Sequence, residues 1–143
     1  MGICYKYFED KNLYIEVGEG DITLDTLAAY FLELEHSVDM NKVQYVYSDF
    51  SRALLNFSDI QIQQITTSFL AFSQEYDFKK WAYVYPTDSK AIQVTKDSFK
   101  DREFDFIKFF TIDQKEESFD FIENDEIVEL INSFLYELNH KDN

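Results

Sequence analysis

The chain has 143 residues, of which 45% are hydrophobic and 18% aromatic, a size and composition typical of one globular domain with an aromatic core. Its 28 acidic and 13 basic side chains give a formal net charge of −15, so we expect no nucleic-acid binding. A lone cysteine and the lack of an apolar run of membrane-spanning length predict a cytoplasmic protein without membrane insertion.

The first part of the chain is predicted to form a hairpin, a helix and a strand. Alternating apolar residues predict antiparallel strands at 3–8 and 12–17, joined by a short connection. Gly18 and Gly20 are expected to mark a turn, and Thr23 is expected to cap a helix with apolar residues at helical spacing. The following strand is expected at 43–49, ending on Asp49.

The rest of the chain alternates between strands and helices. The predicted elements are a helix from Ser58 to about Tyr76, a strand at 80–85, a helix at 88–98, a strand at 104–111, and helical pattern from Asp113 to Leu138 with a break near Asn124. On the second helix we expect Phe69 and Phe72 to be buried, together with Val84 of the neighbouring strand.

This order, ββαβαβαβα with one further helical break, predicts an α/β fold. We expect a single domain over residues 1–138 with a mixed, mostly parallel sheet, which begins with the antiparallel hairpin and is covered by helices. Residues 139–143 are expected to form a polar tail.

The element order and several short segments resemble a known family. The segments are Gly20 to Thr23, the strand end Tyr47-Ser48-Asp49, the apolar strand Trp81 to Tyr85, Phe109 to Thr111, and Glu116 to Phe119. In these features residues 4–123 are similar to the SpoIIAA-like branch of the STAS superfamily. The resemblance implies a non-enzymatic regulatory module that acts through protein partners, with an outline similar to lipid-binding CRAL-TRIO domains.

The resemblance also implies one candidate modification site. In phosphoregulated STAS proteins a strand ends in Asp, and a kinase phosphorylates a serine of an Asp-Ser-Ser-Gly sequence that opens the next helix. Asp49 matches the strand-end Asp, and Ser58 falls where the serine pair begins. Phe57, Asp59 and Ile60 depart from the motif. Ser58 is therefore a candidate phosphosite or an ordinary helix cap, and we favour the cap.

No motif for catalysis, metal binding or a cofactor stands out, and we expect none of the three. The Gly18–Gly20 segment lacks the third glycine of a dinucleotide-binding loop. His36 is expected to be a solvated side chain at a helix end, and His140 lies in the predicted tail. Cys4 is expected to be a buried structural thiol.

Two features remain as candidate binding sites. Asp49, Ser51 and Arg52 form a candidate loop site, in which Arg52 either pairs with nearby acids or receives an anionic group; Arg102 has the same two roles open to it. Aromatic residues around 49–57, the end of the strand at 80–85 and Phe99 are expected to converge outside the carboxyl ends of the parallel strands.

We expect a cytoplasmic regulatory or protein-interaction module whose acidic surface helps to select a protein partner. The alternative is a small carrier that binds an apolar or lipid-like small molecule in a pocket between helices and sheet. Pocket volume distinguishes the two. An enzyme comes third, and a convergent cluster of polar side chains with shifted pKa values would favour it.

Overall fold

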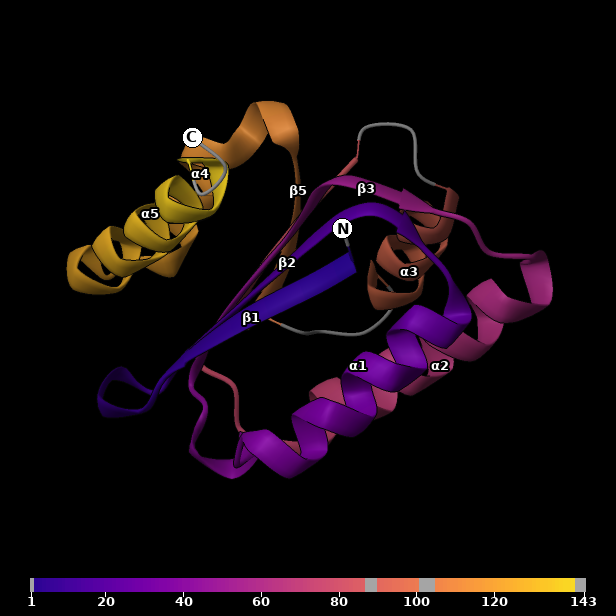
Figure 1. The fold of residues 1–143 in the computed structure, drawn as a ribbon, viewed down its shortest axis with the longest axis horizontal. Coiled ribbons are helices and arrows are strands. Elements are labelled where there is room, and N and C mark those ends of the chain that lie inside the picture. Colours follow the sequence, from indigo (N-terminus) through magenta and orange to yellow (C-terminus); the bar gives the residue numbers. More distant parts are fainter. Residues whose placement is uncertain (1, 87–89, 101–104, 141–143) are drawn as a thin grey trace.

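A computed structural model describes residues 2–86, 90–100 and 105–140, and contains a mixed five-stranded sheet with helices on both faces (Figure 1). The strands are β1 (Gly2–Phe8), β2 (Leu13–Ile22), β3 (Tyr45–Leu55), β4 (Lys80–Tyr85) and β5 (Ile107–Thr111). They lie in the order β1-β2-β3-β4-β5, with β1 antiparallel to β2 and all other neighbours parallel. The predicted α/β class and N-terminal hairpin are confirmed.

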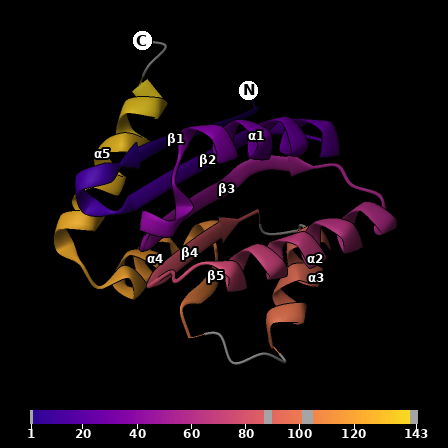
Figure 2. The same cartoon turned by 90° about the horizontal axis from the view of Figure 1, so that it is seen from below.

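The helices are α1 (Leu24–Ser37), α2 (Asp59–Glu75), α3 (Lys90–Lys100), α4 (Lys115–Ile122) and α5 (Asp125–His140). Helices α1, α2 and α3 connect successive parallel strands and cover one face of the sheet, whereas α4 and α5 cover the other (Figures 1 and 2). Connections between parallel strands are right-handed, and each of β3, β4 and β5 lies on the same side of the strand before it. The connecting helices therefore lie on the same face of the sheet. In the described residues, no helix is both long and apolar enough to cross a membrane.

The face under α4 and α5 is densely packed. Alternate residues of the central strands, including Ile15, Tyr47 and Val84, meet buried apolar side chains of the two helices. Buried hydroxyls are paired as well, since the Tyr47 hydroxyl and Ser118 Oγ lie 2.9 Å apart. The helical side chains that fill this layer are Ile122, Ile127, Ile131 and Phe134.

Strands β2 and β3 are both longer than the sequence predicts. Gly18 and Gly20 lie within β2 and not in a turn, and β3 continues past Asp49 to Leu55. The two strands shift register between Val17 and Glu19, and Gly20 has a positive φ of 74°, which glycine adopts without steric cost. The expected turn and the expected strand end at Asp49 are therefore wrong, because an irregular strand continues there.

The structure also differs from expectation near both ends of the described chain. Helix α5 runs through Asn139 and His140, the first two residues of the expected tail, and the His140 ring stacks on Tyr136 with centroids 4.0 Å apart. Residues 141–143 lie outside the described residues. Cys4 is exposed and not buried, since it lies on β1 at the edge of the sheet.

Candidate functional site

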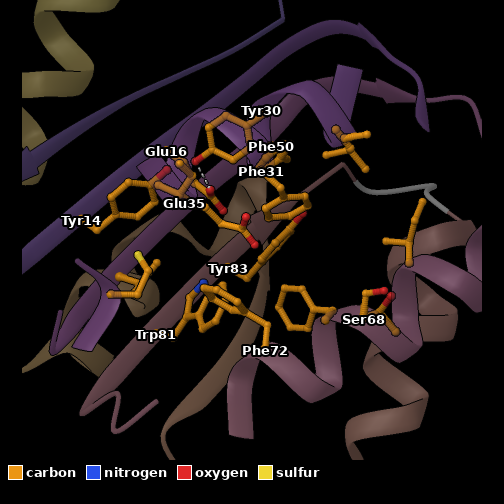
Figure 3. A pocket seen from close by; sticks show the side chains of 18 of the residues that line it. Tyr14, Glu16, Tyr30, Phe31, Glu35, Phe50, Ser68, Phe72, Trp81 and Tyr83 are labelled. Carbon is orange, nitrogen blue, oxygen red and sulfur yellow. Dashed lines mark hydrogen bonds between the residues drawn. The ribbon is translucent and has the colours of Figure 1, made fainter. Parts of the chain in front are cut away.

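A cavity of about 910 Å³ lies between α1 and α2, above the sheet (Figure 3). Strands β2, β3, β4 and β5 contribute its floor, and both helices and the first turns of α3 contribute its walls. This volume is within the range of roughly 300–1,000 Å³ that small-molecule sites occupy. The floor residues include Tyr14, Glu16, Val46, Phe50, Trp81 and Tyr83, together with Phe109 of β5.

The cavity changes the expected burial of the second helix. Phe69 and Phe72 are half-buried and not fully buried, because both line the cavity, whereas Val84 on the opposite face of the sheet is fully buried as predicted. Helix α1 contributes only Tyr30 and Leu34 as buried residues. The two helices therefore leave a cavity above one face of the sheet. On the opposite face, large side chains fill the layer between the sheet and helices α4 and α5.

Glu16 is the polar centre of the cavity floor. It projects from the middle of β2 and is only 8% exposed. The Tyr30 hydroxyl of α1 donates a hydrogen bond of 2.5 Å to Glu16 Oε2, and Ser48 Oγ of β3 donates one of 2.7 Å to Oε1. Trp81 Nε1 in turn donates to Ser48 Oγ at 2.9 Å. Residues of three strands and one helix thus form one hydrogen-bond network around this carboxyl group.

Burial controls the protonation of this group. Loss of solvent raises the pKa of Glu16 from 4.5 to about 7, against the smaller opposing effect of the Ser48 hydrogen bond. Burial also raises the pKa of the Tyr30 hydroxyl, and it raises that of Tyr83, with a further contribution from Glu16. At neutral pH the carboxyl group is therefore poised between its neutral and ionised forms.

The other charges around the cavity are also acidic. Glu35, Asp39 and Glu75 join Glu16 in its lining, with His36 as a further titratable group, and no Lys or Arg is found among the described lining residues. The Tyr14 hydroxyl, beside Glu16 in Figure 3, is buried and has no hydrogen-bond partner in the described structure. The site thus combines an apolar, aromatic wall with acceptor groups on its floor.

The predicted loop site lies elsewhere. Asp49, Ser51 and Arg52 belong to β3, and none of them is among the described residues that line the cavity. Asp49 accepts hydrogen bonds from Ser51 N at 3.0 Å and Ser51 Oγ at 2.6 Å, and it pairs with Lys115 of α4 at 3.0 Å. Arg52 pairs with Glu19 at 3.3 Å, and Arg102 lies outside the described residues. The contacts of Asp49 and Arg52 are those of structural ion pairs.

Ser58 is the N-cap of α2. Its Oγ accepts a hydrogen bond of 3.2 Å from Gln61 N, and Gln61 Oε1 accepts one of 3.0 Å from Ser58 N. This reciprocal pair satisfies two backbone donors at the helix start. The cap that the sequence favours is thus present, and phosphorylation of Ser58 stays the alternative.

The aromatic segments identified in the sequence meet only in part. Phe50, Phe57 and Tyr83 do line the cavity, but Phe99 is not among its described lining residues. The cavity lies over one face of the sheet, between α1 and α2, whereas the sequence predicts convergence outside the carboxyl ends of the parallel strands. We predict no role for Glu16 from the sequence, although an acidic residue between the apolar strand residues Ile15 and Val17 is a signal of a buried carboxyl group.

In the described parts of the chain, no group of three or more His, Cys, Asp or Glu side chains is placed to hold a metal ion. Comparisons with protein-family models, with curated proteins and with solved structures find no match to this chain. Membership of the STAS superfamily therefore stays a prediction.

Proposed function

We propose that this protein is a non-catalytic binding module that holds a small, largely apolar molecule in the cavity between α1 and α2. The cavity volume of about 910 Å³ carries the proposal. Half-buried aromatic side chains such as Phe69 and Phe72 support it, because a ligand would remove their exposed apolar surface from water. Such a carrier is the alternative function that the sequence predicts.

The polar cluster around Glu16 supports binding better than acid–base catalysis. A serine nucleophile needs a free, accessible oxygen, but Ser48 is fully buried and its hydroxyl already donates to Glu16 and accepts from Trp81. The Ser48 hydroxyl thus uses its hydrogen bonds within the cluster, where it holds Glu16 in place. Regulation through a protein partner, as in a STAS-type module, stays a prediction that a ligand-binding role would accommodate.

A pair of neighbouring alanines on α1 offers a direct test. Both are exposed, but Ala28 is among the residues that line the cavity, whereas Ala29 is not among the described lining residues. We expect Nile red, an uncharged apolar dye, to bind the wild-type protein with one saturable site and increased fluorescence. Ala28→Trp should obstruct the cavity and weaken binding about tenfold or more, equivalent to about 1.4 kcal/mol.

Ala29→Trp is the matched control, since it adds the same ring to the same helix one residue away. It should bind the dye as the wild type does. Equal dye binding by both variants, with both folded by circular dichroism, would place the dye outside the cavity and contradict the proposal. Native mass spectrometry of protein purified from its own host would then show whether a molecule is retained at all.

A further inference from the structure

We propose that the ligand of the cavity is a cationic amphiphile, an organic amine whose ammonium group pairs with Glu16 while its apolar body lies against the aromatic walls. This inference rests on the proposed binding function and adds a chemical class to it. It follows from the charges of the lining, from the hydrogen bonding of Glu16 and from the unpartnered Tyr14 hydroxyl.

The charges of the lining select against anions. Four acidic side chains border the cavity, namely Glu16, Glu35, Asp39 and Glu75, and the described lining residues include no Lys or Arg to balance them. A fatty acid or a phosphate-bearing lipid would bring a negative charge into this field without a counter-ion. A ligand with a positive charge gains from the same field. Among largely apolar ligands, the cavity should therefore favour amines over carboxylic acids.

Glu16 offers a specific partner for that positive charge. An ionised carboxylate has about four acceptor positions, and the described structure fills two of them, with neutral hydroxyls of Tyr30 and Ser48. No basic side chain of the described residues forms an ion pair with it. Its raised pKa reflects a buried charge without a compensating partner. An ammonium group of the ligand would supply that partner.

Tyr14 is the independent observation that points to a ligand at the same place. It lies two residues before Glu16 on β2, so both side chains project from the same face of the strand. The residue is 1% exposed, and its hydroxyl has no hydrogen-bond partner in the described structure, an arrangement that is unfavourable in a protein interior. The hydroxyl oxygen can accept an N–H from an ammonium group held by Glu16.

The walls fit the rest of such a molecule. Trp81 and Tyr83 belong to the floor beside Glu16, and Figure 3 shows Phe50, Phe31 and Phe72 around the same space. Aromatic faces attract cations through their quadrupoles and also cover apolar chains. An alkyl or aromatic amine therefore matches both the polar floor and the apolar walls.

Three probes with equal chains separate this inference from the proposed function. Decylamine, decanol and decanoate should each be titrated against bound Nile red at neutral pH and physiological salt. We expect decylamine to displace the dye at a concentration about tenfold or more below that of decanol. Decanoate should be the weakest of the three.

Glu16→Gln, which keeps the shape and removes the charge, should abolish the preference of decylamine over decanol. Glu33→Gln removes a charge from an exposed position of α1 outside the described lining, and it should keep the preference. Tyr14→Phe deletes only the unpartnered hydroxyl, so it should fold at least as stably as the wild type and bind decylamine several-fold more weakly.

The outcomes are distinguishable. Equal binding of the three probes would overturn the amine assignment and leave the binding function standing. A preference for decylamine that survives in Glu16→Gln would also overturn it, because the attraction would then come from the acidic surface as a whole. If neither the dye nor any probe binds, the proposed function itself is wrong.

Discussion

Glu16 occupies a position where an ionised group is costly. It lies on a strand whose neighbouring residues, Ile15 and Val17, are buried apolar side chains, and it is itself nearly inaccessible to water. Two hydroxyl donors partly compensate for the loss of hydration, but they carry no charge. At pH values between 4.5 and about 7, the neutral form of the Glu16 carboxyl group is therefore favoured in the folded protein and the ionised form in the unfolded chain.

This difference predicts how stability depends on pH. The folded-state pKa of about 7 lies above the ordinary value of 4.5, so the folded protein binds the additional proton between these values. The contribution of Glu16 to the free energy of unfolding should be fully present below pH 4.5, and it should be lost as the pH rises through about 7. The loss should amount to about 3 kcal/mol in the free energy of unfolding.

Urea unfolding of the wild type and of Glu16→Gln over this pH range measures the effect. The difference in the free energy of unfolding should shift in favour of the variant as the pH rises, since glutamine cannot ionise. Glu33→Gln should follow the wild type. Parallel pH profiles for the wild type and Glu16→Gln would mean that Glu16 remains hydrated in the folded protein.

At the scale of the elements, the sequence predicts most of the fold but not the length of β2 and β3, and it offers a pocket between helices and sheet only as an alternative. Strand β4 has its predicted bounds, and α2 begins at the predicted Ser58 cap, because Pro86 and the capping residues are local signals. The glycines of β2 signal a turn equally well, and pairing of Gly18 with Ile3 of β1 and of Gly20 with Ala53 of β3 holds them in a strand. The same pattern of aromatic residues in a sequence can line a cavity or fill a core, so the pattern does not distinguish the two.

Gly18 shows why β2 requires glycine where it passes β3. A Cβ atom added at this position would overlap the ring of Phe50, which stacks on Tyr83 with centroids 5.4 Å apart. Gly18→Ala should therefore lower the free energy of unfolding by about 1–3 kcal/mol, the usual cost of overpacking. Urea unfolding provides the measurement.

A double-mutant cycle tests the cause of this loss. Phe50→Leu removes the ring that the new methyl group would meet, so Gly18→Ala should cost less in that background than in the wild type. Fully additive effects of the two substitutions would assign the loss to the backbone of β2 and not to the contact with Phe50.

At the scale of the whole molecule, the helices on the two faces of the sheet differ in how many side chains they bury. Helix α5 buries Ile127, Ile131 and Phe134 in a continuous core, whereas α1 buries only Tyr30 and Leu34 and borders the cavity. Helices with few buried contacts open locally at a lower free-energy cost than the core does. We therefore expect α1 to open more readily than α5 when the cavity holds no ligand.

Hydrogen exchange tests this division directly. Without ligand, the backbone amides of α1 should exchange faster than those of α5, since fewer buried side chains hold α1 to the sheet. Nile red at about 100 times its Kd should stabilise the closed form by about 2.7 kcal/mol and slow exchange in α1 and α2 about a hundredfold. Amides of α5 that open only locally should change little, because α5 packs on the other face of the sheet. Slowing that is confined to α5, or equally large in all helices, would show that the cavity is not where the ligand acts.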